Sequence, residues 1–147
     1  MRARRLSLTA ALLGSLLVTR HPSAQGRIAP TVDQILSLER AGSPDISPDG
    51  RFVAYTVRTT NWEDNSYDTR IWLAEVETGA TRQLTAGRKS SQSPAWSPDG
   101  RRLAFVSDRT DKRQIYVMDP TGGEADALTT GEDGVGAFAW APDGRSI

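Results

Sequence analysis

The tetrapeptide Ser47-Pro48-Asp49-Gly50 decides the fold of this chain, because it occurs three times. It returns as Ser97-Pro98-Asp99-Gly100 and, with alanine in the first position, as Ala141-Pro142-Asp143-Gly144. Proline fixes φ near −65° at the second position of a tight turn, and glycine accepts the left-handed conformation that completes the turn. Each copy therefore predicts a turn between two strands, and the three copies together indicate an internal repeat.

The residues between the turns repeat as well. Three further pairs lie 44 residues apart: Ile71-Trp72-Leu73 with Ile115-Tyr116-Val117, Leu84-Thr85 with Leu128-Thr129, and Trp96 with Trp140. Within the second unit, the composition predicts four short strands, at residues 95–96, 102–107, 115–118 and 127–129. A unit of about 44 residues with four strands has the size of a propeller blade.

The sequence thus predicts an all-β fold, a partial β-propeller of two four-stranded blades and the start of a third. We place the blades at about residues 44–92 and 93–136, and the start of the third at 137–147. A single four-stranded blade leaves both faces uncovered, and propellers stack about 4–8 blades around an axis. We therefore expect residues 44–147 to be an incomplete propeller that continues beyond Ile147.

The first unit contains six extra residues, since its turn lies 50 residues before the next one rather than 44. The extra residues fall between Asn61 and Asp68, which we predict to be a long surface loop. This loop mixes aromatic and carboxylate side chains, which are our candidates for contact with a substrate or a partner domain. These candidates are Trp62, Glu63, Asp64 and Tyr67. The alternative is a surface insertion without a function.

The N-terminus has the pattern of an export signal. An arginine-rich start precedes the apolar run from Leu6 to Val18, and small residues follow, so residues 1–26 are predicted to be a signal peptide. The run is shorter than the roughly 20 residues that cross a bilayer; an uncleaved anchor is the alternative. After cleavage we expect the protein to be periplasmic or extracellular, without attachment to a membrane.

Residues 27–43 are predicted to form a linker and a short helix before the propeller. Thr31 and Gln34 have the spacing of a capping box, and Gly42 is a natural stop for a helix from Thr31 to Ala41. The helix would carry an apolar stripe, which we expect to pack against the first blade. The stripe consists of Val32, Ile35, Leu36 and Leu38.

The composition excludes several kinds of chemistry. The first 24 residues hold four arginines and no acid, so the rest of the chain has 14 basic and 18 acidic residues. This acidic balance argues against nucleic acid and anionic membranes as partners. The chain has no cysteine, and its one histidine, His21, lies within the predicted signal peptide. We therefore predict no catalytic, metal-binding or cofactor-binding residue in this chain.

Several segments together resemble the start of the prolyl oligopeptidase family of serine peptidases, in particular its bacterial dipeptidyl-peptidase and acylaminoacyl-peptidase branch. They are the helix at 31–36, the stretch Gly42-Ser43-Pro44-Asp45-Ile46-Ser47-Pro48-Asp49-Gly50-Arg51, and the repeat units that follow. The resemblance implies a propeller followed by a C-terminal α/β-hydrolase domain with the catalytic serine, aspartate and histidine. It also implies that the propeller restricts access to short peptides, so peptide substrates and the hydrolase domain would be its partners.

Two alternatives stay open. The first is a periplasmic propeller similar to TolB, which binds protein partners and catalyses nothing. Such proteins usually have a separate α/β domain between leader and propeller, whereas only about 20 residues separate Gly26 from the first turn here. The second is a propeller fused to a metal-dependent amidohydrolase. The sequence favours the peptidase.

Overall fold

The computed structural model describes residues 29–87 and 89–147, so the predicted signal peptide at residues 1–26 lies outside the described residues. The described residues form one short helix and eight strands. The elements are α1 (Val32–Leu36), β1 (Arg40–Ile46), β2 (Phe52–Asn61), β3 (Ser66–Glu75), β4 (Thr81–Gln83), β5 (Ser91–Trp96), β6 (Leu103–Ser107), β7 (Gln114–Met118) and β8 (Asp126–Ala127).

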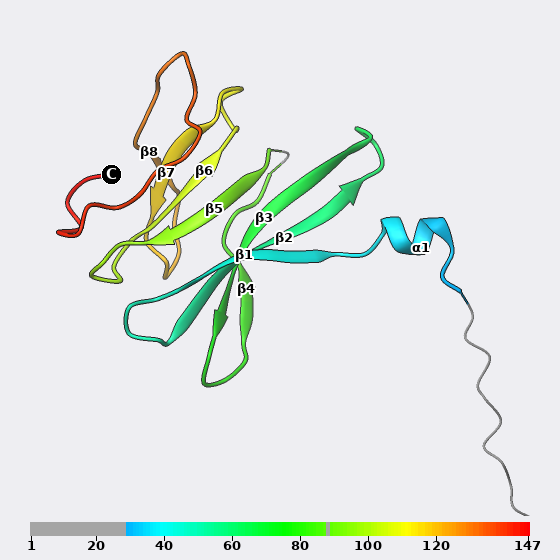
Figure 1. Cartoon of the computed structure of the whole chain (residues 1–147), viewed down its shortest axis with the longest axis horizontal. Helices are drawn as coiled ribbons and strands as arrows, with labels where there is room; N and C mark the ends of the chain where they lie inside the picture. The colour runs from blue at the N-terminus through cyan, green and yellow to red at the C-terminus, as the bar shows by residue number, and fades with distance from the viewer. Residues whose placement is uncertain (1–28, 88) are drawn as a thin grey trace, which may run out of the picture.

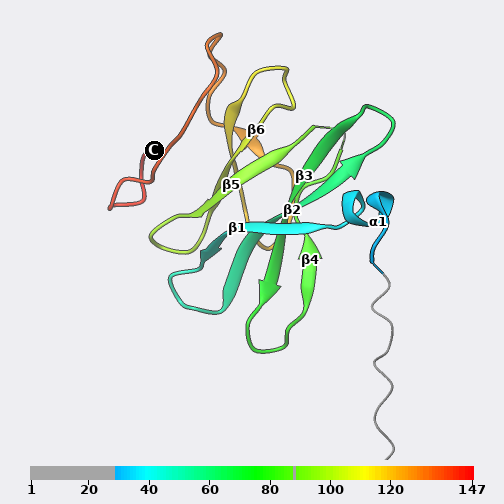
Figure 2. The same ribbon diagram turned by 45° about the vertical axis from the view of Figure 1, so that its right-hand side comes forward.

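The strands form two antiparallel sheets that lie side by side (Figures 1 and 2). The first sheet has the order β1-β2-β3-β4 and the second the order β5-β6-β7-β8, so each strand pairs with its neighbours in sequence. Strand β5 contacts β1, β2 and β3, which places the first strand of the second sheet against the first sheet. This arrangement confirms the predicted pair of four-stranded blades, which we name blade 1 and blade 2.

The repeated tetrapeptide forms a closed turn between the first two strands of blade 1. The amide of Gly50 donates to the carbonyl of Ser47 (2.8 Å), and the amide of Ser47 donates to the carbonyl of Phe52 (2.8 Å). The carboxylate of Asp49 accepts from the Ser47 hydroxyl (2.6 Å) and from the amide of Arg51 (3.0 Å). These donors, the hydroxyl first, hold the pKa of Asp49 below its ordinary value. Glycine is required at the fourth position because φ is 71° there.

Blade 2 makes the same contacts around Ser97, and the Ser97 hydroxyl likewise lowers the pKa of Asp99. In the third copy, the amide of Gly144 donates to the carbonyl of Ala141 (2.9 Å), but alanine has no hydroxyl to offer the neighbouring carboxylate. The predicted start of a third blade is thus present as its turn, and residues 137–147 contain no strand.

The first strand of each blade contains a bulge. The registers of β1 against β2 and of β5 against β6 shift at the same point of the repeat. There Ser43 (φ 46°) and Ser93 (φ 55°) precede Pro44 and Pro94. Proline has no amide to donate to a ladder, so a bulge is the place where a strand accepts it.

A repeated contact joins one blade to the next. The indole N–H of Trp96 donates to the carbonyl of Asp45 (3.2 Å), and that of Trp140 donates to the carbonyl of Ala95 (3.0 Å). Asp45 and Ala95 hold the same place in successive repeat units. Each tryptophan therefore fixes its own unit against the equivalent backbone atom of the preceding unit, which confirms the repeat at the level of packing.

The hydrophobic core lies between the two blades. Phe105, Ile71 and Leu103 are fully buried, and the rings of Phe52 and Trp96 stack with their centroids 6.5 Å apart. Burial of such side chains stabilises a fold by about 1.5–3 kcal/mol each. The remaining core residues are Ala54, Leu73, Tyr116 and Met118. Blade 1 thus supplies one wall of the core and blade 2 the other.

The helix differs from its prediction. The capping box is present, since Thr31 and Gln34 exchange both hydrogen bonds (2.9 and 3.2 Å). The helix ends at Leu36 rather than Ala41, because Arg40 already pairs with Arg58 of the long strand β2. The expectation that its stripe packs against blade 1 was also wrong. The exposed fractions are 71% for Val32, 43% for Ile35, 37% for Leu36 and 61% for Leu38.

The six extra residues of blade 1 do not form a long loop, and that prediction was wrong as well. They lengthen the hairpin of β2 and β3, whose ladder runs without a break from Phe52↔Glu75 to Asn61↔Ser66. Both strands have ten residues, whereas β6 and β7 have five. Only residues 62–65 form the turn, and this turn projects past the end of blade 2 (Figure 1). We name it the hairpin tip.

Candidate functional site

The predicted site residues lie at one end of the blades. Because neighbouring strands are antiparallel, successive connections alternate between two ends of a blade. The repeated turns lie at one of them. The hairpin tip, the start of β1 and the start of β5 lie at the other, which we name the hairpin end. The hydroxyl of Thr60 donates to the carbonyl of Leu36 and ties α1 to this end.

Asn61 organises the hairpin tip. Its side-chain oxygen accepts from the amides of Glu63 and Asp64 (3.1 Å each), and its side-chain nitrogen donates to Asp64 (3.1 Å) and Asp68 (3.4 Å). Asn65 adopts a φ of 48°, a conformation that asparagine tolerates better than most residues. The tip is therefore a folded turn with fixed hydrogen bonds.

The structure places Trp62, Glu63 and Asp64 in the hairpin tip and Tyr67 next to it in β3, and these residues have different surroundings. Asp64 is held by Asn61, and Tyr67 lies under the guanidinium of Arg58, 3.7 Å from the centre of its ring. Trp62 is 58% exposed and Tyr67 48% exposed. Trp62 and Glu63 project from the tip without a side-chain hydrogen bond or ion pair to the described residues. The tip thus offers an aromatic and acidic surface for contact.

Sequence reasoning missed two further residues at this end. Arg40 and Arg58 lie directly opposite each other on β1 and β2. Arg40 had been assigned to the helix, so its position beside Arg58 could not be predicted. A strand assignment for residues 40–46, together with the extended hairpin, would have found the pair.

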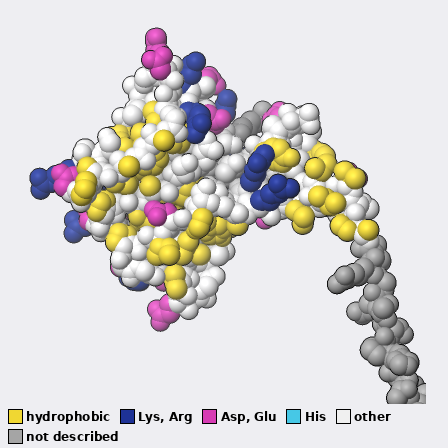
Figure 3. All heavy atoms as spheres, in the orientation of Figure 1, with side chains coloured by type: hydrophobic (Ala, Val, Ile, Leu, Met, Phe, Trp, Pro, Cys, Tyr) yellow, Lys and Arg dark blue, Asp and Glu magenta, His cyan; other side chains and the backbone are white. Residues whose placement is uncertain are grey.

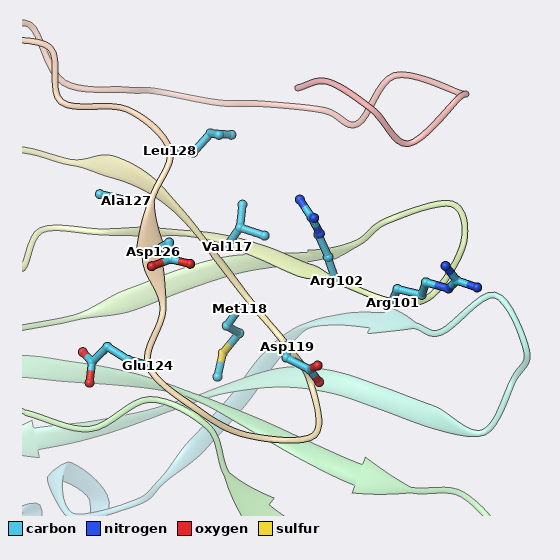
Figure 4. Close-up of a pocket in the computed structure, with 9 residues that line it drawn as sticks. All are labelled: Arg101, Arg102, Val117, Met118, Asp119, Glu124, Asp126, Ala127 and Leu128. Atoms are coloured by element: carbon cyan, nitrogen blue, oxygen red, sulfur yellow. The ribbon is translucent and has the colours of Figure 1, made fainter.

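A hollow lies on blade 2 at the end of the strands opposite the hairpin end (Figure 4). Val117 and Leu128 form its apolar part, and charged side chains surround them: Arg101, Arg102, Asp119, Glu124 and Asp126. Leu128 is 54% exposed, whereas Leu84, its equivalent in blade 1, packs against the core between the blades. This hollow therefore corresponds to the surface against which the next blade packs, and we do not interpret it as a ligand site.

Metal and membrane sites can be judged only for the residues that the structure describes. Among these, no group of three or more histidine, cysteine, aspartate or glutamate side chains is placed to hold a metal ion. In the same part of the chain, no helix combines the length and the apolar character that a membrane span needs.

Comparison with known proteins establishes the family. The TolB β-propeller domain family matches residues 32–147, which include both blades and the third turn. The chain therefore belongs to this family of propeller domains. The match begins at Val32, the first residue of α1.

The similar proteins include peptidases and a TolB protein. The chain is 45% identical over 96 residues to the uncharacterized peptidase YuxL of Bacillus subtilis, covering 65% of this chain and 15% of that protein. It is 37% identical over 106 residues to the Tol-Pal system protein TolB of Alkalilimnicola ehrlichii, covering 72% and 24%. Among solved structures, the acylaminoacyl peptidase of Pyrococcus horikoshii matches with a TM-score of 0.63 and 25% identity, covering 76% and 17%.

These matches confirm the resemblance to the propeller of prolyl oligopeptidase family peptidases, and the peptidase relative is more similar in sequence than the TolB relative. The chain spans less than a quarter of the length of each of the three proteins. The similarity therefore concerns the propeller, and the activity of a whole protein is a separate question.

Proposed function

We propose that this chain is the N-terminal propeller part of a secreted serine peptidase that cleaves short peptides. The observation that carries the proposal is the 45% identity to a protein named as a peptidase, together with the fold shared with an acylaminoacyl peptidase. In this proposal a C-terminal α/β-hydrolase domain supplies the catalytic serine, aspartate and histidine. The propeller controls which peptides reach them.

The hairpin end is the surface that would face the hydrolase domain. The chain enters β1 at this end, and the apolar stripe of α1 is uncovered there (Figure 3). Trp62 and Tyr67 add exposed aromatic area at the same end. Exposed apolar area of this kind, surrounded by polar residues, is typical of a surface that contacts another domain. Glu63, which projects beside it, supplies a carboxylate that can meet the amino end of a peptide.

The cellular location is part of the same proposal. The arginine-rich start and the apolar run that follows it support export, and a mature protein in the periplasm or outside the cell would meet short peptides there. Mass spectrometry of the N-terminus of the secreted protein tests this point. Cleavage near residue 26 supports export with processing, and an N-terminus that retains residues 1–26 contradicts it.

Activity is tested on the complete product of the gene. A serine-directed fluorophosphonate probe should label it at one site, and chromogenic dipeptide and acylaminoacyl substrates should be hydrolysed. Substitution of the labelled serine by alanine is the control, since it should abolish both signals. Hydrolysis that survives this substitution, or a pure protein that neither reacts nor hydrolyses, contradicts the proposal.

A binding propeller similar to TolB is the second candidate. The family match and the 37% identity to a TolB protein favour it. The reading frame on either side of this chain separates the two candidates. A serine in a Gly-x-Ser-x-Gly turn, followed by aspartate and histidine, is required for the peptidase. Further repeats that end without such a domain would support the binding module.

A further inference from the structure

An open groove lies on blade 1 where the long hairpin extends past blade 2. The ladder of β2 and β3 has ten residue pairs and that of β6 and β7 has five, so the hairpin of blade 1 is longer than that of blade 2. The groove has a volume of about 450 Å³. Its floor comes from β2 and β3, one wall from the start of β1 and the other from the start of β5. The residues that carry charge or aromatic surface are Arg40, Arg58 and Tyr67.

The charges in this groove are unbalanced. Arg40 and Arg58 are direct cross-strand partners, and like charges in that position destabilise a sheet. The ion pairs of the described residues join Asp68 to Arg70, Asp111 to Lys89 and Glu124 to Arg109, so neither groove arginine has a carboxylate within 4.0 Å among them. The lining residues include no acid. The groove therefore presents two positive charges that a bound anion would neutralise.

The geometry prepares one of the arginines for recognition. The guanidinium of Arg58 lies over the ring of Tyr67 at 3.7 Å, and this cation–π contact restricts its position. The guanidinium is planar, and its N–H groups match the two oxygens of a carboxylate. Hydroxyl groups of Ser43 and Ser90 line the same groove and are further possible donors. Figure 3 shows basic side chains clustered beside helix α1.

We propose that this groove binds the carboxylate of a peptide through Arg40 and Arg58. The inference rests on the proposed function, since it assigns the substrate class to the same propeller. The groove opens at the hairpin end, where the chain enters the propeller, and the acidic tip lies on the same hairpin. The two sites have opposite charge, so a short peptide can be held by its amino end at one and by its carboxylate at the other.

The test compares matched peptides on the complete gene product. Each pair has neutral side chains and differs only in a free C-terminal carboxylate or a C-terminal amide. We expect kcat/KM to favour the acid by about tenfold or more, as the strength of hydrogen bonds to charged groups implies. The double variant R40Q/R58Q should lose this preference, whereas the single variant R58K, which keeps the charge, should retain part of it. Arg51→Gln, an exposed arginine beside the first tetrapeptide turn at the opposite end of blade 1, is the matched control and should retain it.

A second peptide amide that carries one glutamate identifies the source of the carboxylate. A gain in kcat/KM for this peptide that disappears in R40Q/R58Q supports recognition of a side chain, and a gain limited to the free acid supports recognition of the C-terminus. Equal kcat/KM values for the free acid, the amide and the glutamate-containing amide in the wild type, or a gain for either carboxylate that survives R40Q/R58Q, overturn the inference. A thermal melt of each variant, followed by circular dichroism, checks that the variant is folded.

Failure of the proposed function is distinguishable from failure of this inference. If no peptide is cleaved, the peptidase proposal fails, and the same acid and amide peptides can then be titrated calorimetrically without being consumed. Binding of the acid that is lost with the amide and in R40Q/R58Q still supports the groove. Binding that ignores the carboxylate overturns it.

Discussion

Replacement of Trp96 by alanine should cause the largest loss of stability of any tryptophan substitution in the described chain. The side chain is 7% exposed, stacks against Phe52 and donates its indole N–H to the carbonyl of Asp45. Removal of a buried aromatic side chain costs about 3–5 kcal/mol. The aromatic pair accounts for roughly 0.5–1.5 kcal/mol of this, and the hydrogen bond for about 1 kcal/mol. Since a domain is stable by about 5–15 kcal/mol, the variant should be close to unfolding.

Urea denaturation followed by far-UV circular dichroism measures this loss, because that signal does not depend on the tryptophan removed. Trp62→Ala is the matched control: the same atoms are deleted at a site that is 58% exposed, and the change should stay within about 0.5 kcal/mol. The loss of stability of Trp96→Phe should lie between those of Trp96→Ala and Trp62→Ala, because phenylalanine keeps the ring stacking and loses the N–H donor. If Trp96→Ala is no more destabilised than Trp62→Ala, the blades are not held together through this contact.

Three further substitutions have defined outcomes. Gly100→Ala should cost about 1–2 kcal/mol in urea denaturation, because φ is 70° there; an unchanged midpoint would show that the turn relaxes. Thr85→Val should cost about 1–3 kcal/mol in the same assay, because the amide of Ile71 loses its acceptor at 2.9 Å; a neutral result would mean that another acceptor replaces it. Ser97→Ala should raise the pKa of Asp99 towards its ordinary value, which NMR titration of the carboxyl can follow. Because the folded pKa is depressed in the wild type, the stability linked to it is present above about pH 4 and is lost as the pH falls through the folded pKa. The difference in melting temperature between wild type and variant should therefore shrink in acid, and a difference independent of pH would contradict this assignment.

The repeat made most of the fold predictable. The Pro-Asp-Gly turns, the tryptophans and the 44-residue spacing are local features, and each is confirmed by the same hydrogen bonds in successive blades. The capping box of Thr31 could also be predicted from the sequence, because both of its hydrogen bonds join residues three positions apart.

The errors concern pairing between distant residues. The helix was extended to Ala41 because local periodicity could not show that Arg40 pairs with Arg58. The insertion was predicted as a loop because it lengthens one repeat unit and not the other, whereas the ladder of β2 and β3 continues to Asn61 and Ser66. Because of these two errors the groove could not be predicted, since its two arginines become neighbours only when β1 pairs with the long hairpin.

The bond between each tryptophan and the preceding blade has a consequence for how such proteins change over time. The acceptor is a main-chain carbonyl, so any amino acid can occupy the position that provides it, and here Asp45 and Ala95 do so in turn. A copied repeat unit would bring its own donor and find an acceptor already in place. A duplicated or exchanged blade can therefore keep this indole bond without a matching substitution in the neighbour. The side chain at the acceptor position can make a contact of its own, as the Asp45 carboxylate does when it accepts from the amide of Trp96 (2.7 Å).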